Sequence, residues 1–128
     1  MEKFIAIFVG GGIGALSRYL FAGIVQSRTD SIFPWGTLAV NLLGCFIIGF
    51  LWTLFEFLPV SVTLRLFFIT GILGGFTTFS SYGVETLNLA RDGELLHAAA
   101  NIMVSNIAGI ALVFCGVIVS RFLIGIMR

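Results

Sequence analysis

Charged residues are scarce in this sequence. Asp, Glu, Lys and Arg together make up 10% of its 128 residues, whereas 59% of the residues are hydrophobic. A soluble domain carries about 25% charged residues, and a helix needs roughly 20 apolar residues to cross the hydrocarbon core of a bilayer. Four such stretches fit into the chain and leave almost nothing over, which excludes an additional soluble domain. The net charge of +1 gives no indication of an acidic partner.

Histidine and cysteine are nearly absent as well. His97 is the sole histidine, and it stands beside a loop with no second candidate ligand nearby, so a metal site built on it is not expected. Cys45 and Cys115 both fall within apolar stretches and form no C-x-x-C pair, which is typical of inert packing residues. No set of nucleophile, base and orienting residue is visible. The sequence therefore predicts a protein that is not an enzyme.

Four long apolar stretches dominate what the sequence does contain. They predict an all-α membrane protein in which residues 1–128 form a single transmembrane domain of four helices. We expect the spans at about residues 4–25, 35–57, 62–90 and 95–126.

One stretch interrupts the third of these spans. Gly71–Tyr82 brings glycines, among them Gly74 and Gly75, and then hydroxyl residues interleaved with aromatic ones. Each glycine weakens a helix by about 1 kcal/mol, and the hydroxyl groups can bind freed backbone groups or a ligand. Broken backbone at membrane depth is tolerated only where it is buried in protein or lines a polar cavity, and in transporters it commonly holds the ion site. We therefore expect a break near residues 74–78, with the functional site around it.

Arg18 is a charged residue inside the first span. A charge there costs at least about 2.5 kcal/mol unless it is solvated or paired. Two interpretations are open: the side chain anchors the helix by reaching the interface, or it lines an aqueous vestibule. In the same span, Gly10 and Gly14 lie four residues apart on one face, which predicts close packing against another helix.

Two other spans carry polar side chains at helical spacing. Thr37 and Asn41 are four residues apart in the second span, and Asn101 and Ser105 are four residues apart in the fourth. An amide deep in a membrane needs a partner, because hydrocarbon offers none. Each pair can therefore form hydrogen bonds between helices or supply the donors that line an ion path.

The basic residues show little preference for either end of the bundle. With four spans, both termini lie on one side of the membrane. Four basic residues then lie on the side of the termini and two on the opposite side, and Arg18 lies nearer to the opposite side. The four are Lys3, Arg65, Arg121 and Arg128, and the two are Arg28 and Arg91. So weak a bias predicts insertion in both orientations. Two oppositely oriented copies would then supply the inverted symmetry that many transporters build within one chain.

Three motifs follow one another along the chain: GGIGALSRY at residues 11–19, GTLAVNLLG at 36–44 and GILGGFTTFS at 71–80. Together with the length, the four spans and the weak charge bias, they resemble the signatures of the CrcB/Fluc family of fluoride channels. The resemblance implies an antiparallel homodimer of oppositely oriented subunits with two fluoride pores. It also implies a structural sodium ion at the dimer interface, held by backbone carbonyls of Gly74 and Thr77 from both chains.

The resemblance also implies roles for single residues. Asn41 matches the family's pore asparagine, and Arg18 matches its first-helix arginine, which we place in a vestibule. Phe79 matches the first of two pore phenylalanines, and Tyr82 stands where the family usually has the second. The stripe of Asn101 and Ser105 on the fourth span resembles the family's polar track in its placement.

Fluoride holds its water tightly and only accepts hydrogen bonds, so a pore must replace that water with donors. The expected donors are Asn41, Thr37, Ser80, Ser105 and Asn101, and the ring edge of Phe79 adds a partial positive charge. The function implied is passive export of cytoplasmic fluoride, and hence fluoride resistance, across a bacterial inner or plasma membrane.

Other classes of function remain as alternatives. A small proton-coupled multidrug exporter also has four spans and dual topology, but it needs a membrane carboxylate, usually in the first span. Here that span carries Arg18 and no carboxylate beyond Glu2. A non-conducting structural subunit would explain the glycines but not the converging hydroxyl and amide groups.

Overall fold

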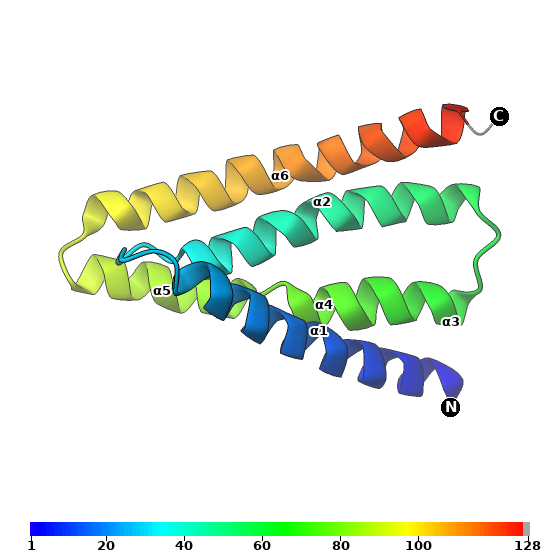
Figure 1. The fold of residues 1–128 in the computed structure, drawn as a ribbon, viewed down its shortest axis with the longest axis horizontal. Coiled ribbons are helices and arrows are strands. Elements are labelled where there is room, and N and C mark those ends of the chain that lie inside the picture. The colour runs from blue at the N-terminus through cyan, green and yellow to red at the C-terminus, as the bar shows by residue number, and fades with distance from the viewer. Residues whose placement is uncertain (127–128) are drawn as a thin grey trace.

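The computed structural model describes residues 1–126, and these residues form helices joined by short connections (Figure 1). Four helical segments are long and apolar enough to cross a membrane: Glu2–Gln26, Trp35–Phe57, Val62–Arg91 and Leu95–Ile126. This confirms the predicted all-α class with four spans, and the chain is a multi-pass membrane protein. The start of the first span and the end of the fourth lie at the same end of the bundle (Figure 1). Arg128, counted above among the basic residues, lies outside the described residues.

The first two helices, α1 (Glu2–Gln26) and α2 (Trp35–Phe57), are joined by a loop that one side chain holds in place. Gln26 Nε2 donates to the carbonyl oxygens of Ser31 (3.1 Å) and Phe33 (3.2 Å). Gln26 Oε1 accepts from the backbone N–H of Gly36 at 3.1 Å. That N–H belongs to the first turn of α2, where no intrahelical acceptor exists. The side chain at the end of α1 therefore closes the loop and caps α2.

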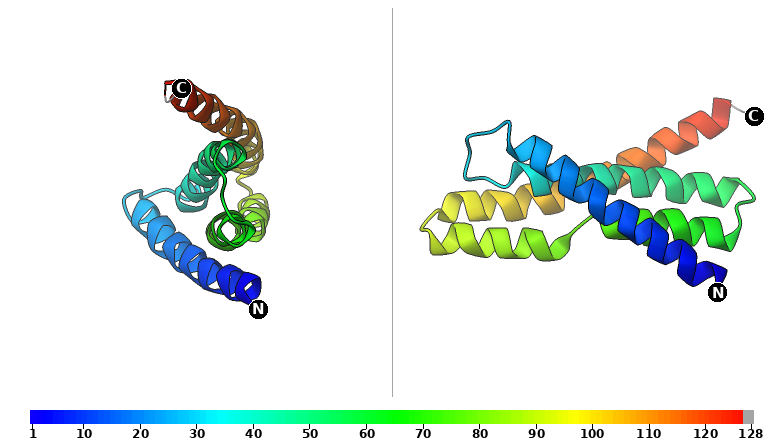
Figure 2. Two further views of the ribbon diagram at one scale, coloured as in Figure 1. Left: turned by 90° about the vertical axis from the view of Figure 1, so that its right-hand side faces the viewer. Right: turned by 60° about the horizontal axis from the view of Figure 1, so that its bottom comes forward.

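The third span consists of four pieces rather than one helix. They are α3 (Val62–Arg65), the π-helical stretch η1 (Leu66–Leu73), α4 (Gly74–Phe76) and, after a gap of two residues, α5 (Phe79–Arg91). Figure 2 shows these two residues as a short non-helical segment between α4 and α5. A π-helix is rare, occurs mostly as a single turn within an α-helix, and is frequently found at functional sites.

The break itself falls after the glycines, at Thr77 and Thr78. Gly74 keeps helical dihedral angles (φ −63°, ψ −36°), whereas Thr77 (−76°, 153°) and Thr78 (−147°, 112°) are extended. Two successive β-branched residues favour extended backbone. The Thr78 side chain then caps α5 by accepting from the Ser81 N–H at 3.2 Å. The predicted break is confirmed, but threonines form it and the glycines stay helical.

The glycines instead allow α1 to approach η1 and α4. A Cβ at Gly10 would lie 2.6 Å from the Phe67 carbonyl oxygen, and one at Gly75 would lie 2.5 Å from that of Gly11. A Cβ at Gly14 would collide with the Ile72 carbonyl oxygen. Such approaches exclude any larger side chain, as the spacing of Gly10 and Gly14 predicts.

The last helix, α6 (Leu95–Ile126), packs along α2. It follows a tight turn in which Gly93 has φ 83° and the Glu94 N–H donates to the Leu89 carbonyl oxygen at 2.9 Å, the hydrogen-bond pattern of a Schellman motif. Gly49 on α2 and Gly116 on α6 make this contact close, because a Cβ on either would meet backbone of the other helix.

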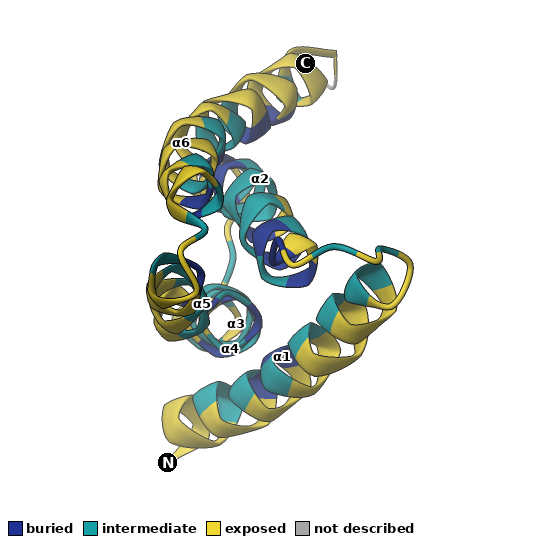
Figure 3. Cartoon of the chain, turned by 90° about the vertical axis from the view of Figure 1, so that its left-hand side faces the viewer, coloured by how far each residue is buried: buried dark blue, intermediate teal, exposed yellow. Residues whose placement is uncertain are grey.

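Large apolar side chains cover the outer surface of the chain. Phe8 is 83% exposed and Phe114 65% exposed, and Figure 3 shows exposed faces along α1 and α6. The buried hydrophobic residues are few and concentrate where the helices meet, among them Val40, Leu73 and Phe76. Lipid or another protein chain must cover apolar surface of this extent.

Candidate functional site

Asn41 pairs with the backbone of the break. Its Oδ1 accepts from the Thr78 N–H at 2.7 Å, and its Nδ2 donates to the Thr78 carbonyl oxygen at 2.9 Å. The predicted hydrogen bond between helices therefore exists, and it pairs with broken backbone rather than with another side chain. Thr78 is itself 6% exposed, so without Asn41 both backbone groups would be unsatisfied in an apolar setting.

Two backbone N–H groups that would donate to carbonyl oxygens in an unbroken helix donate to side chains here. The Thr78 N–H, the i+4 partner of the Gly74 carbonyl, donates to Asn41. The Ser81 N–H, the i+4 partner of the Thr77 carbonyl, donates to Thr78 Oγ1. The carbonyl oxygens of Gly74 and Thr77 thus do not accept the hydrogen bonds that a continuous helix would give them. Arg18 Nη1 donates to the Thr77 oxygen at 3.4 Å.

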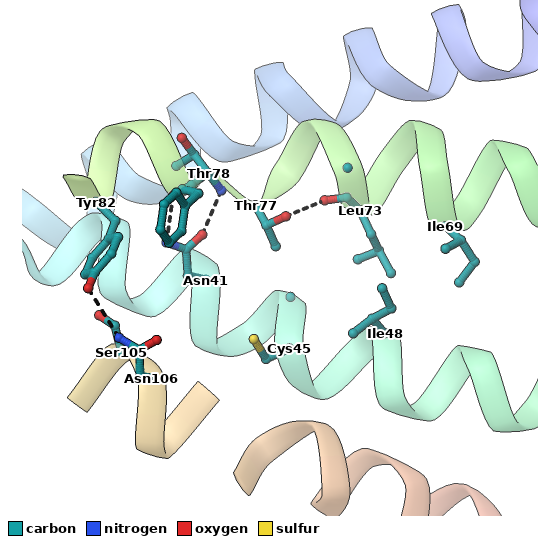
Figure 4. A pocket seen from close by; sticks show the side chains of 13 residues that line it. Asn41, Cys45, Ile48, Ile69, Leu73, Thr77, Thr78, Tyr82, Ser105 and Asn106 are labelled. Carbon is teal, nitrogen blue, oxygen red and sulfur yellow. Dashed lines mark hydrogen bonds between the residues drawn. The ribbon is translucent and has the colours of Figure 1, made fainter. Parts of the chain in front are cut away.

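Beside the break lies a cavity of about 360 Å³ between α2, the third span and α6 (Figure 4). It brings together four of the predicted pathway residues, Asn41, Phe79, Tyr82 and Ser105, with both predicted sodium-binding residues, Gly74 and Thr77, around it. No charged side chain lines it. The lining combines apolar residues with a few hydroxyl and amide groups, which can donate hydrogen bonds to a small ligand.

Phe79 and Tyr82 form an aromatic pair at the start of α5. Their ring centroids are 5.3 Å apart and their planes are tilted by 52°. Phe79 is 81% exposed in the single chain, which leaves its ring edges accessible. The Tyr82 hydroxyl reaches α6, where Asn106 Nδ2 lies 3.3 Å from it.

Arg18 and Thr37 lie in a second cavity, of about 550 Å³, on the other side of Thr78. Glu85 shares this cavity. Thr37 Oγ1 donates to Glu85 Oε1 at 2.7 Å, and Glu85 Oε2 is buried without a hydrogen-bond partner among the described residues. The hydroxyl hydrogen of Thr37 is therefore engaged by a carboxylate.

Two predicted pathway residues line neither cavity. Asn101 is 2% exposed, donates to Thr86 Oγ1 at 2.9 Å and accepts from Ser105 Oγ at 3.4 Å. It therefore joins α5 to α6. Ser80 is exposed, and its Oγ lies 3.4 Å from Thr78 Oγ1.

Sequence reasoning did not single out Thr86 or Asn106. Each follows a predicted residue at close spacing: Thr86 is four positions after Tyr82, and Asn106 is next to Ser105. The predicted polar stripe of the fourth span runs through Asn101 and Ser105. Asn106 lies about 100° further around the helix than Ser105, so it falls outside that stripe.

Side chains alone do not form a metal site in the described chain. Residues 1–126 contain no group of three His, Cys, Asp or Glu side chains placed to hold a metal ion. His97 Nδ1 lies 3.0 Å from Glu94 Oε2 at the start of α6, and both side chains are more than 40% exposed. A cation at the break would therefore have to be held by neutral oxygens, those of backbone carbonyls or of hydroxyl and amide side chains.

Comparisons with known proteins agree with this architecture. Residues 5–117 match the family described as CrcB-like protein, Camphor Resistance (CrcB). Three similar proteins are each named fluoride-specific ion channel FluC. The one from Desulforapulum autotrophicum is 43% identical over 95% of this chain and 98% of its own length. The one from Salinibacter ruber is 44% identical over 98% and 94%. The one from Parabacteroides distasonis is 39% identical over the full length of both chains. The chain therefore belongs to the CrcB family.

Proposed function

We propose that this chain forms a fluoride-selective channel that lets fluoride leave the cell passively. The observation that carries the proposal is the uncharged cavity beside the break, in which amide, hydroxyl and aromatic groups converge. The names of the three relatives support the same function, because each matches nearly the whole chain. An ion channel of this kind is not an enzyme.

The donor set suits a small anion that must also be released. Asn41 Nδ2 has two hydrogens, of which one pairs with Thr78, so one remains for an ion. The hydroxyls of Ser105 and Tyr82 and the positive ring edges of Phe79 extend the path. Because no lysine or arginine lines the cavity, the anion is not held by a full opposite charge.

Fluoride efflux from liposomes tests this function. Purified protein is reconstituted in vesicles loaded with potassium fluoride, and valinomycin starts the efflux. We expect rapid fluoride release and none of chloride from matched vesicles. Proton-driven uptake of a cationic dye without fluoride release would contradict the proposal and favour the multidrug exporter.

We propose further that two oppositely oriented copies assemble through the face that contains the break. Gly74 supports this proposal, because a Cβ added there would meet nothing closer than the Ile69 carbonyl oxygen at 3.8 Å within its own chain. Packing within the chain thus gives no reason for glycine at this position. The high exposure of Phe79 on the same cavity is consistent with cover by a second copy.

A reporter tests the dual topology. We expect a fusion at the C-terminus to be found on both sides of the membrane. Lysines added to one set of loops should reduce fluoride efflux unless an oppositely biased variant is co-expressed. Full activity from a population with one orientation would contradict the proposal.

The same interface suits a structural sodium ion. Carbonyls of unwound backbone coordinate sodium in transporters, and the Gly74 and Thr77 carbonyls have lost their helical donors. Two copies would supply four such oxygens, with Arg18 using only one lone pair of each Thr77 oxygen. We expect the dimer to melt at a lower temperature when N-methylglucamine replaces sodium. Equal melting temperatures in the two buffers, with a dimer in both, would argue against the ion.

A further inference from the structure

Asn106 on α6 makes two contacts that together fix the orientation of its amide. Asn106 Nδ2 lies 2.7 Å from the Ile102 carbonyl oxygen and 3.3 Å from Tyr82 Oη. The Ile102 carbonyl carries no hydrogen, so the atom 2.7 Å away must be a donor. Turning the amide round would set two acceptors against each other. The NH₂ group therefore faces both partners and gives one hydrogen to each.

This orientation determines what the Tyr82 hydroxyl can do. A phenolic hydroxyl has one hydrogen to donate and lone pairs that accept. Because Tyr82 Oη accepts from Asn106, its own hydrogen must point elsewhere. No acceptor within residues 1–126 receives that hydrogen, and Tyr82 and Asn106 both line the cavity beside the break (Figure 4).

We propose that Asn106 is a positioning residue, which occupies the lone pair of Tyr82 and turns the hydroxyl hydrogen toward the anion path. The proposal rests on the proposed fluoride function and adds a specific donor to it. The Asn106 contact thus allows a tyrosine to serve where an oxygen atom would otherwise repel an anion.

Removal of Asn106 should have an effect on fluoride passage that depends on the residue at position 82. Without the amide, the hydroxyl rotates freely and presents its lone pairs to the anion path part of the time. A phenylalanine at position 82 has no oxygen and needs no such control. Loss of Asn106 should therefore matter when Tyr82 is present and matter little when it is not.

The experiment compares fluoride efflux from liposomes for four proteins: the unchanged protein, Asn106→Leu, Tyr82→Phe and the double variant. Asn106 is exposed, so Asn106→Leu should fold, and size-exclusion chromatography with circular dichroism verifies this for every variant. We expect Asn106→Leu to lower efflux about fivefold, the effect of one hydrogen bond. The double variant should regain the efflux of Tyr82→Phe.

The efflux of the double variant distinguishes a positioning role of Asn106 from a purely structural one. If Asn106 only stabilised the contact between α5 and α6, the double variant would be no better than Asn106→Leu. That result, or unchanged efflux in Asn106→Leu, would overturn the proposal while leaving the fluoride function intact. An unchanged protein that releases no fluoride would instead overturn the proposed function, and this inference with it.

Discussion

At the scale of single residues, the position of Asn41 fits both its hydrogen bonds to the backbone and the role proposed for it on the anion path. Its amide satisfies both backbone groups of Thr78 and still faces the cavity. Sequence analysis left a choice between a hydrogen bond across helices and a position on an ion path. The geometry makes these compatible, since an amide nitrogen has two hydrogens and only one is needed for Thr78.

Asn41→Asp should therefore abolish most fluoride efflux. A carboxylate repels the anion and sets two acceptors against each other at the Thr78 carbonyl, where an unpaired buried group costs about 1–3 kcal/mol. Each 1.4 kcal/mol or so at a barrier slows passage about tenfold. Asn41→Ser, which removes the amide without adding charge, is the control and should lose less efflux. Normal efflux in Asn41→Asp would remove this residue from the path.

The aromatic pair gives a second test at this scale. Phe79→Leu should keep the folded protein but lose most fluoride efflux, because an aliphatic side chain has no positive edge to replace lost water. Tyr82→Phe should stay active and Tyr82→Leu should not. Efflux and dimer content of all three variants are compared with those of the unchanged protein. Normal efflux in Phe79→Leu, with unchanged dimer content, would identify the ring as ordinary packing.

At the scale of helices, the sequence predicts that the third span breaks but not how. Hydroxyl groups and glycines inside an apolar run indicate an interruption, and one is present. The π-helical stretch and the close approach of Gly71 and Gly75 to α1 involve residues distant in the sequence, so no local pattern reveals them. The positions of Asn106 and Gln26 also depend on distant partners, so their contacts become visible only in three dimensions.

Gln26 provides a test of stability at this scale. Gln26→Leu removes two donors and one acceptor from the loop between α1 and α2, so it should destabilise the protein by about 1–3 kcal/mol. Thermal unfolding in detergent measures this as a fall of a few degrees in Tm. Ser27→Ala is a matched control, because the Ser27 hydroxyl only donates to its own helix at Ile24. Equal Tm values for Gln26→Leu and Ser27→Ala would show that Gln26 does not hold the loop.

At the scale of the whole molecule, the apolar faces of the chain and the exposed residues Gly74 and Phe79 on either side of the break call for a partner. Large apolar side chains remain uncovered in the single chain, and the carbonyls of Gly74 and Thr77 are released from their helix. The weak charge bias predicted from the sequence permits a partner of opposite orientation. A second copy is the simplest assembly that covers these groups by symmetry.

Gly74→Val tests this assembly directly. A Cβ there would approach its own chain no closer than 3.8 Å, an ordinary contact with the Ile69 carbonyl oxygen, so the monomer should fold while the dimer weakens. Gly125→Val is a control, since Gly125 also has open space around it but lies near the end of α6, away from the break. Crosslinking and size-exclusion chromatography measure the dimer. If Gly74→Val and Gly125→Val dimerise equally well, the break does not lie at the interface.

The central claim is that fluoride crosses this protein passively and selectively. The most direct measurement is the reversal potential of a planar bilayer that contains the purified protein, with fluoride on one side and chloride on the other. We expect a current whose reversal potential follows the fluoride gradient and does not move when the proton gradient is changed. A reversal potential that follows the proton gradient, or equal permeation of chloride, would contradict it.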